Sequence, residues 1–507
     1  MKINHLKHFG LACMLGMLTA SCGDDYLNAY DKSVITTEDE ADMEKENPEQ
    51  LLTIINSRLT GIYAYLAQPT FGALASDFGW MSLCHLSDIM TEDIAMHKIG
   101  SGQYTFDYAL DYWKQDYVRG HQIWLFFYTI INRSNEVLEK INPETTNSRL
   151  REIMGELHAL RGYSYFYLAQ FFQRTYVGHE NEPGCPIYYP SSVGGDILNR
   201  ASLSRVYAQI DADFLKALEL LTGVKHTSKT SIDESVASGL YARVCLVKND
   251  WANAVKYAQL AQQTSNTTLM TISSYEKDGF NNLQNEEWMW GIDINAKTAT
   301  GFASFFSFVG SYDAGYGGDV GAYRKIDARL YGQFSQSDVR RKNFKDPKGN
   351  YSGKEALFPD YTNLKFKKVA NWEGDYVFMR RSEMLLIEAE AYARQNELSK
   401  AAETLGKLMV NRDPSWQKMQ VSVDEVYLQR RLELWGEGFA LFDRQRLKKG
   451  IERLYSGSNH LVTQQFNVVP ESWYFHFQIS RRELENNNYI SAADQNPAPN
   501  ESDKVYK

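Results

Sequence analysis

The sequence has few of the features that mark membrane-spanning, nucleic-acid-binding or metal-binding proteins. After the first 21 residues, no segment contains the roughly 20 uninterrupted apolar residues that a membrane-spanning helix needs. The net charge is −9, which gives no support for nucleic acid as a partner, because such a partner favours a basic face. The ten histidines show no His-Glu-x-x-His motif and no paired ligand spacing. We therefore predict no metal site and no cofactor.

Cysteine is also scarce. The chain contains five cysteines and no Cys-x-x-Cys motif, so neither zinc nor thioredoxin chemistry is indicated. If the first two belong to an export segment, the other three allow one disulfide at most. The five are Cys13, Cys22, Cys84, Cys185 and Cys245.

The N-terminus has the pattern of an export signal. Lys2 and Lys7 precede a short apolar stretch, and the sequence Leu-Thr-Ala-Ser then leads to Cys22. Small residues before a cysteine resemble the bacterial lipobox, in which the cysteine becomes the acylated first residue; the alternative is an ordinary signal peptide with a chance cysteine. We predict a signal peptide over 1–21, acylation of Cys22 and a polar tether over 22–47. Acyl chains would anchor the protein to a membrane.

Most of the remaining chain shows helical periodicity. Small alanines recur where neighbouring helices must approach closely, as in helical-repeat proteins. We predict four helix pairs: 50–66 with 117–141, 150–172 with 203–221, 235–247 with 250–264, and 380–395 with 398–412. One segment departs from this pattern, because Trp288, Trp290, Ile292 and Ile294 alternate with smaller or polar residues and predict a short strand. Residues 77–111 show no period and are predicted to be rich in loops.

A third C-terminal helix is predicted over 423–447. Its apolar residues recur at spacings of four and three, which puts them on one helical face, while its charged residues fall on another. The apolar stripe consists of Leu428, Leu432, Trp435, Phe439 and Phe442, and the charged residues are Arg430, Glu433, Glu437 and Arg444.

Several motifs resemble those of one family. The C-terminal motifs are Arg381-Ser382-Glu383-Met384-Leu385-Leu386-Ile387-x-Ala389-Glu390-Ala391 and Arg430-x-x-Glu433-Leu434-x-x-Glu437-Gly438-x-x-x-Phe442-Asp443-x-x-Arg446. The N-terminal motif is Ala159-Leu160-Arg161-Gly162-Tyr163-Ser164-Tyr165-Phe166-Tyr167-Leu168, followed by Pro186-Ile187. Together they resemble the SusD/RagB family, although Ser480 stands where the closing motif of that family usually has proline.

This resemblance implies a mainly α-helical, tetratricopeptide-based lipoprotein in the outer membrane that faces the exterior. It implies a SusC-like TonB-dependent transporter as partner, and capture of a nutrient, mostly an oligosaccharide or polysaccharide, without cofactor. One domain would span 48–507, with ligand-binding insertions at about 77–113 and 295–375. A peptide-capturing member of the family and a helical-repeat protein-interaction scaffold are the alternatives.

An enzyme is the less favoured interpretation. Glycosidases need two carboxylates across a cleft, and Asp77, Asp88, Glu286 and Glu287 are available for such a role. The 63 acidic residues make pairs of this kind inevitable, so we predict a binding protein without catalytic residues. The glycine-rich stretch 315–321 lacks the Gly-x-Gly-x-x-Gly spacing of a dinucleotide site.

Aromatic residues are the best candidates for ligand contact. The chain contains 32 tyrosines, and a tyrosine or tryptophan ring offers a flat apolar face that suits the C–H face of a sugar. Aromatics in loops with Gly or Asp are the most promising, and we expect the loop 302–323 to meet the ligand opposite 77–113. The predicted ligand contacts are Trp80, Trp113, Tyr312, Tyr316, Tyr323 and Trp372. The tryptophans assigned to the core are Trp124, Trp251, Trp288, Trp290 and Trp435.

Overall fold

The computed structural model describes residues 47–71, 74–99, 102–312, 315–367 and 369–506. The predicted signal peptide, Cys22 and nearly all of the predicted tether lie outside the described residues. A short first unit ends at Ile54, and the second unit, from Ile55 onward, contains almost all of the secondary structure.

The chain is mainly helical, as predicted, with short strands. The helices are α3 Pro48–Tyr65, α4 Trp80–Ile89, α5 Thr105–Tyr108, α6 Val118–Leu138, α7 Ser148–Phe172, α8 Leu203–Leu221, α9 Glu234–Val247, α10 Trp251–Thr264, α11 Ile272–Lys277, α12 Phe305–Val309, α13 Ala328–Tyr331, α14 Arg381–Arg394, α15 Leu398–Met409, α16 Val423–Glu433, α17 Ala440–Arg446 and α18 Arg481–Asn486. The strands are β1 Ile94–Met96, β2 Trp288–Ile292, β3 Arg324–Ile326, β4 Tyr376–Arg380, β5 Ile451–Glu452, β6 Phe466–Val468 and β7 Lys504–Tyr506.

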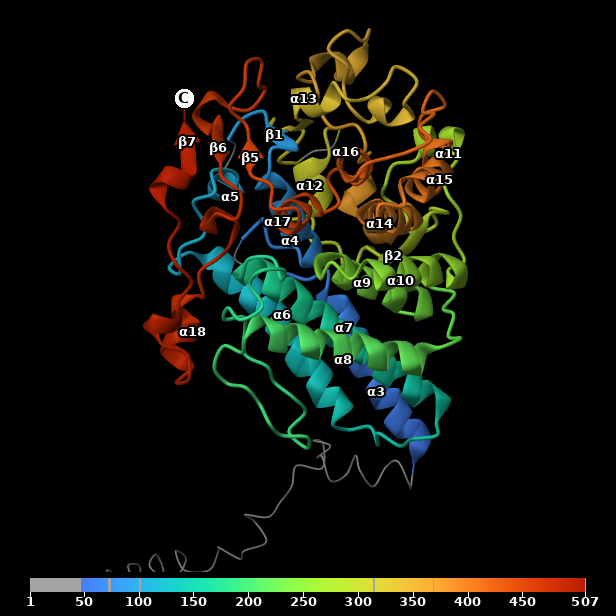
Figure 1. Cartoon of the computed structure of the whole chain (residues 1–507), viewed down its shortest axis with the longest axis vertical. Coiled ribbons are helices and arrows are strands. Elements are labelled where there is room, and N and C mark those ends of the chain that lie inside the picture. The colour runs from blue at the N-terminus through green and yellow to red at the C-terminus, as the bar shows by residue number, and fades with distance from the viewer. Residues whose placement is uncertain (1–46, 72–73, 100–101, 313–314, 368, 507) are drawn as a thin grey trace, which may run out of the picture. The chain divides into compact units, whose positions relative to one another are not determined.

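The long helices form a row that follows the order of the chain. Helix α6 packs on α7, α7 on α8, α8 on α9, α9 on α10, α10 on α14 and α14 on α15 (Figure 1). Such a row is the helical-repeat arrangement expected from the sequence. Three predicted pairs are present, namely α7 with α8, α9 with α10 and α14 with α15, whereas α6, which was expected to pair with 50–66, packs mainly along α7.

Asparagine forms the turns of two of these pairs. Asn249, between α9 and α10, has φ 58°, and Asn396, between α14 and α15, has φ 62°. Asparagine adopts this left-handed conformation more readily than most residues, so it can end a helix abruptly. Directly after Asn249, the Asp250 side chain accepts a hydrogen bond from the Asn253 backbone amide and caps the N-terminus of α10.

Glycine and one buried arginine hold α7 against α8. A Cβ on Gly162 would lie 3.1 Å from the Cβ of Asp213, so the two helix backbones approach closely there. The neighbouring Arg161 guanidinium donates to Asp213 at 2.6 Å and to Asn135 of α6 at 2.7 Å. Arg161 therefore joins three helices.

The strands close the gaps between the helices. β2 pairs antiparallel with β4, and β1 with β3, while β5, β6 and β7 form a small antiparallel sheet near the C-terminus. Trp288 and Trp290 of β2 are fully buried, as predicted, and so are nearly all atoms of Trp124 and Trp435. The prediction for Trp251 is wrong in part: it is only half-buried, with the Arg394 guanidinium over its ring.

Residues 77–96 contradict the expectation of a loop-rich segment. They contain helix α4 and strand β1, and every residue of both is buried. A helix that is buried on all faces shows no polar stripe, and the sequence therefore gives no helical period.

The predicted helix 423–447 is broken into α16 and α17. The break contains Gly436 with φ 79° and Gly438 with φ 91°. A Cβ on Gly438 would lie 2.5 Å from the Cβ of Cys84, and its amide donates to Asp88 at 2.8 Å. These glycines end α16 and let the chain pass close to α4. Leu432 is buried as expected, at 3% exposure.

The charged residues of this segment are buried as well, contrary to the expectation of a separate charged face. Arg430 pairs with Asp443, and Arg444 with Glu92. Glu433 and Glu437 join an interior ion-pair network, the charge cluster, made of Glu287, Lys365, Arg380, Arg412, Glu433 and Glu437. The Arg380 guanidinium of β4 lies 2.6 Å from Glu287, the residue before β2, and 3.0 Å from Glu433 at the end of α16, so the cluster joins these three segments. Buried charges are tolerated only when they are paired in this way.

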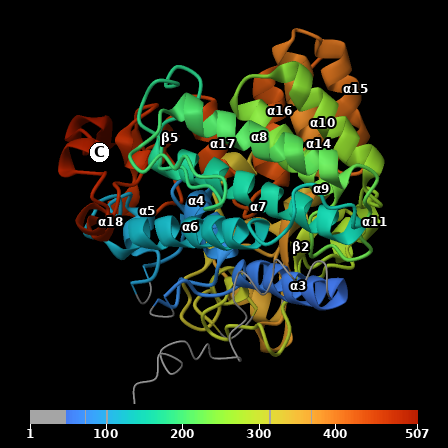
Figure 2. The ribbon, with the colours of Figure 1, turned by 90° about the horizontal axis from the view of Figure 1, so that it is seen from below.

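The described cysteines, Cys84, Cys185 and Cys245, are free and buried, so the disulfide left open by the sequence is absent from the described part of the chain. Among the described helices, none is long and apolar enough to cross a membrane. In Figure 2 the loops of residues 295–375 lie to one side of the helix row, away from α8.

Candidate functional site

Two segments that are distant in the sequence, 77–113 and 295–375, pack against each other. β1 pairs with β3, and α12 lies against α4. At this contact the Phe308 ring stacks on Phe78 at 5.8 Å and meets the edge of Tyr104 at 5.1 Å. The two segments are therefore neighbours in the fold, and the ligand contact expected of them stays a prediction.

Three aromatic rings gather at the surface above Phe308. Tyr316 stacks flat on Phe308, with ring centroids 4.4 Å apart and an interplanar angle of 5°. Phe302 contacts Tyr316 at 4.6 Å and the edge of Trp372 at 6.1 Å. Phe302 is 44% exposed, and Tyr316 and Trp372 are half-buried. Phe302, Tyr316 and Trp372, called the Tyr316 cluster below, thus present apolar ring surface to solvent over a rigid base.

Glycines place Tyr316 in this position. A Cβ on Gly317 would lie 2.4 Å from the Gly310 carbonyl oxygen, and one on Gly315 would lie 2.7 Å from the Ser307 hydroxyl. The Gly317 amide donates to the Ser307 carbonyl at 2.8 Å. The turn can therefore lie directly on α12 only because these positions have no side chain.

Strained backbone places Trp372. Asn371 and Trp372 are consecutive non-glycine residues with φ 54° and 58°. Each residue in this region costs on the order of 1–3 kcal/mol, and such strain concentrates at binding sites. This unusual backbone conformation fixes where the Trp372 ring leaves the chain.

A second group of rings lies nearby on the same segments. Tyr312 meets Phe358 at 5.2 Å, and Tyr323 meets Phe358 at 5.4 Å and His97 at 6.0 Å. The Tyr312 hydroxyl donates to Glu355 at 2.6 Å. Burial, and then the Glu355 carboxylate, raises the pKa of Tyr312, so its hydroxyl stays protonated. Tyr312 is thus fixed in place, whereas Tyr323 keeps a half-exposed ring.

The other two candidates lie elsewhere. Trp80 is 3% exposed, at the start of α4, and its indole is enclosed by aromatic rings. These rings are Phe126, Phe127, Tyr163 and Tyr167. Trp113 is half-buried, and its carbonyl accepts a hydrogen bond from the Gln478 amide near the C-terminus. Trp80 and Trp113 therefore lie outside the Tyr316 cluster.

Two family models match the chain, one after the other. Residues 40–246 match a model described as starch-binding associating with outer membrane, and residues 251–498 match the SusD family model. The chain belongs to the SusD/RagB family. No curated protein matches it.

Solved SusD-like structures superpose on this SusD/RagB protein over most of its length. A SusD-like carbohydrate binding protein from Bacteroides vulgatus ATCC 8482 is 26% identical, with a TM-score of 0.75, covering 88% of this chain and 98% of the other. A SusD superfamily protein from Bacteroides thetaiotaomicron VPI-5482 is 19% identical, with a TM-score of 0.72 over 88% and 100% of the chains. Surface glycan-binding protein A from Bacteroides thetaiotaomicron, in complex with laminarihexaose, is 16% identical, with a TM-score of 0.64 over 86% and 98%.

The SusD/RagB motifs of this protein are structural. Glu383 pairs with Arg243 of α9 at 2.7 Å, and Arg430 pairs with Asp443 at 3.0 Å. All four side chains are buried. These motif residues therefore join α9 to α14 and α16 to α17 in the interior.

The carboxylates considered for glycoside hydrolysis are engaged in the interior, except Glu286. Asp77 accepts hydrogen bonds from Gln122 and the Phe71 amide, and Glu287 belongs to the charge cluster. Burial raises the pKa of Asp88 to about 7, although two backbone amides oppose this shift. Among the described residues, no group of His, Cys, Asp or Glu side chains is arranged to hold a metal.

Sequence reasoning missed one exposed ring beside Tyr316 in this SusD/RagB protein, Phe302, and did not foresee that the buried Phe358 packs against Tyr312 and Tyr323. Phe302 is more exposed than the tyrosine it contacts, and Phe358 joins Tyr312 to Tyr323. Proximity to Gly301, with φ 60°, is a signal that could have identified Phe302.

Proposed function

We propose that this protein binds an oligosaccharide or polysaccharide on the Tyr316 cluster, with Tyr323 extending the same face. The observation that supports this most strongly is the exposed Phe302 ring, which lies beside Tyr316 and Trp372. Gly315 and Gly317 hold the turn that carries Tyr316. A sugar presents an apolar C–H face, and stacked aromatic rings match it without reordering flexible side chains.

The surroundings of these rings supply polar partners for hydroxyl groups. Tyr316 and Tyr323 each keep a hydroxyl, and burial raises the pKa of both, so each can donate and accept a hydrogen bond. Asn371, next to Trp372, is exposed and adds an amide. This combination of rings and neutral polar groups suits a neutral glycan.

The structural relatives support a carbohydrate ligand. One of them is a SusD-like carbohydrate binding protein, and another contains laminarihexaose.

We further propose that the protein is an outer-membrane lipoprotein. It would be acylated at Cys22, face the exterior and deliver its ligand to a SusC-like TonB-dependent transporter. The description of the matched N-terminal family model, which names association with the outer membrane, supports the location. Small residues before Cys22 support the anchor. Replacing Cys22 with Ala should release the protein from membranes, and isolation of native membranes should recover a transporter with the wild-type protein.

The experiment that tests the ligand class is a binding screen of the full chain in detergent against polysaccharides, oligosaccharides and peptides. Saturable binding to one glycan class and none to peptides is the expected result. Binding to peptides alone would replace the proposal with peptide capture. Binding to neither, by a folded protein, would favour a scaffold that recognises only protein.

A further inference from the structure

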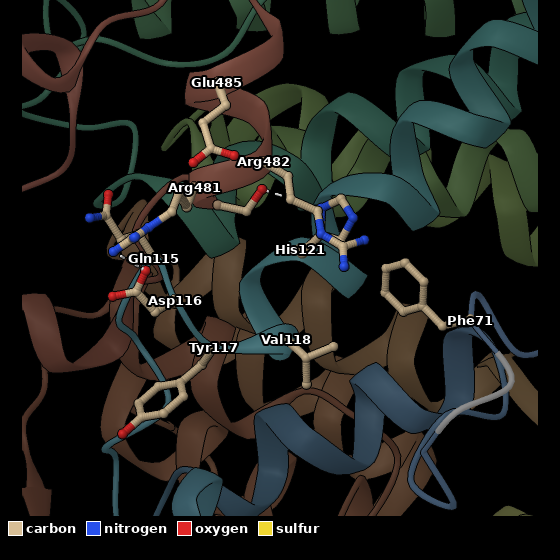
Figure 3. Close-up of a pocket in the computed structure, with 10 residues that line it drawn as sticks. Phe71, Gln115, Asp116, Tyr117, Val118, His121, Arg481, Arg482 and Glu485 are labelled. Atoms are coloured by element: carbon tan, nitrogen blue, oxygen red, sulfur yellow. Dashed lines mark hydrogen bonds and ion pairs between the residues drawn. The ribbon is translucent and has the colours of Figure 1, made fainter.

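A cavity lies between the start of α6 and the short helix α18. It has a volume of about 600 Å³, within the range of small-ligand sites. None of its lining residues belongs to the Tyr316 cluster. The lining residues that matter most are Phe71, Asp116, Tyr117, His121, Arg481 and Arg482 (Figure 3). We call this cavity the Arg482 cleft.

The two arginines of the cleft differ in their partners. Arg481 is paired with Asp116 at 2.5 Å, so its charge is compensated. Arg482 has no ion-pair partner among the described residues, although Glu485 lies one turn along the same helix. Figure 3 shows the Arg482 side chain beside the His121 ring, with Glu485 on the same short helix. The cleft thus contains a guanidinium that forms no ion pair within the described part of the chain.

His121 is held in a fixed orientation next to this guanidinium. Its ring stacks on Phe71 at 5.0 Å, and its Nδ1 lies 3.2 Å from the hydroxyl of Ser480, which is buried. Burial, and then the charge of Arg482, lowers the pKa of His121, so the imidazole is neutral at pH 7 in the free protein. A ligand anion placed between Arg482 and His121 would offset the charge of Arg482 and raise the pKa of His121, which favours the protonated ring.

An aromatic patch continues from the cleft. Tyr117 stacks on Tyr112 at 4.9 Å, and Phe106 lies 5.3 Å from Tyr112 and 6.1 Å from Tyr117. The three rings lie within 21° of parallel, and Phe106 is 47% exposed. Such a patch suits the apolar faces of neighbouring sugar units.

We propose that the Arg482 cleft is a second binding site, for a sugar unit that bears an anionic group such as the carboxylate of a hexuronate. The anion would lie between Arg482 and His121, and adjoining sugar units would lie on Tyr117 and its neighbours. A charge-assisted hydrogen bond from a guanidinium to a carboxylate is stronger than one between neutral groups. This inference shares the ligand class of the proposed function but depends on different residues.

The test uses calorimetric titration of the full chain in detergent at pH 7 with trigalacturonate and with the neutral galactose trisaccharide of the same linkage. We expect the acidic trisaccharide to bind at least about tenfold more tightly, and Arg482→Gln to remove that difference. Arg205→Gln, at an exposed arginine of α8, is the matched control and should bind like wild type. Equal binding of the two trisaccharides, or an unchanged affinity in Arg482→Gln, would overturn the proposal.

A pH series gives a second, independent readout. The charged groups that line the cleft with His121 are Arg482, Arg481, Asp116 and Glu485. Burial, and then Arg482, lowers the pKa of His121, and a bound anion would raise that pKa again. Affinity for trigalacturonate should therefore rise as pH falls from 8 to 5.5, and His121→Gln should abolish this rise. A pH-independent affinity of the wild type would contradict the placement of the anion.

Two further measurements separate this inference from the proposed function. Tyr316→Ala should leave trigalacturonate binding unchanged, and a loss there would move the acidic ligand to the Tyr316 cluster. A sulfated form of the galactose trisaccharide that binds as tightly as trigalacturonate would support recognition of anionic sugars in general. Binding of the uronate by a protein that binds no neutral glycan would sustain the cleft and remove the proposed role of the Tyr316 cluster.

Discussion

Arg412 and Glu433 face each other in the interior, with the guanidinium Nε 3.0 Å from a carboxylate oxygen and neither side chain exposed. The Glu433 carboxylate also forms ion pairs with the guanidinium groups of Arg380, at 3.0 Å, and Arg340, at 3.4 Å. Burial alone would raise the pKa of Glu433, but these three guanidinium groups lower it well below its ordinary value. One carboxylate thus compensates charges from three separate segments.

Replacing Glu433 with Gln should destabilise the protein by about 3–5 kcal/mol, because it leaves buried guanidinium charge without a partner. The measurement is the free energy of unfolding in denaturant. Glu452→Gln is the control: Glu452 pairs with Arg329 at the surface, where both side chains are largely exposed, and its loss should cost less than about 1 kcal/mol. Similar effects of the two substitutions would mean that the charge cluster contributes little.

Leu432→Ala should cost roughly 2–5 kcal/mol through lost burial and a residual cavity, since Leu432 is 3% exposed on α16. Leu357→Ala, at a side chain that is 80% exposed, should leave the melting temperature unchanged. Equal melting temperatures of both variants and the wild type would show that the α16 face is not packed.

Buried histidines should make the protein less stable as pH falls below about 6.5, the ordinary histidine pKa. Burial, and next Arg174, lowers the pKa of His476 to about 3, and burial lowers that of His460 to about 4 despite nearby Asp327. Because the pKa values of these two side chains are lowered in the folded protein, His460 and His476 gain protons between pH 6.5 and 4 only when the chain is unfolded. Each histidine then reduces stability by about 1.4 kcal/mol per pH unit.

His476→Gln should therefore flatten the decline of the unfolding free energy between pH 6.5 and 4. The comparison is of slopes, so a general loss of stability in the variant does not affect it. A slope identical to that of the wild type would indicate that His476 is protonated in the folded protein.

Gly317→Ala should displace the turn that presents Tyr316, because the new Cβ would lie 2.4 Å from the Gly310 carbonyl oxygen. We expect a loss of roughly 1–3 kcal/mol in stability together with weaker glycan binding. Gly61→Ala is the control, since a Cβ there has no neighbour within 4 Å and its helix should tolerate alanine. Wild-type glycan affinity in Gly317→Ala would show that the turn does not position the ligand.

Periodicity predicted the long helices well because their buried faces repeat every three or four residues. It missed α4, where all ten residues are buried and no face is polar. It also extended a helix across Gly436 and Gly438, although two glycines in a helix interior are themselves a warning. Spacing alone could not show that a carboxylate such as Glu433 points inward, because its partners come from distant parts of the sequence.

The candidate site was located more reliably than its members. Glycine and aromatic residues in one loop pointed to Tyr316, and the structure places the exposed Phe302 ring and Trp372 beside it, while ligand binding there stays a prediction. Trp80 has a similar sequence context to Tyr316, but it starts a buried helix. Composition shows that a ring lies in an irregular segment, and only the packing of distant elements determines whether that ring reaches solvent.

Calorimetric titration of Tyr316→Ala and Trp372→Ala with the glycan found by screening tests the central claim most directly. Each substitution should weaken binding by roughly 1–2 kcal/mol, on the order of tenfold, and leave the melting temperature nearly unchanged. Tyr506→Ala, at a tyrosine that is 53% exposed on β7, should bind like wild type. Wild-type affinity in both Tyr316→Ala and Trp372→Ala would contradict the assignment of the Tyr316 cluster as the glycan-binding face.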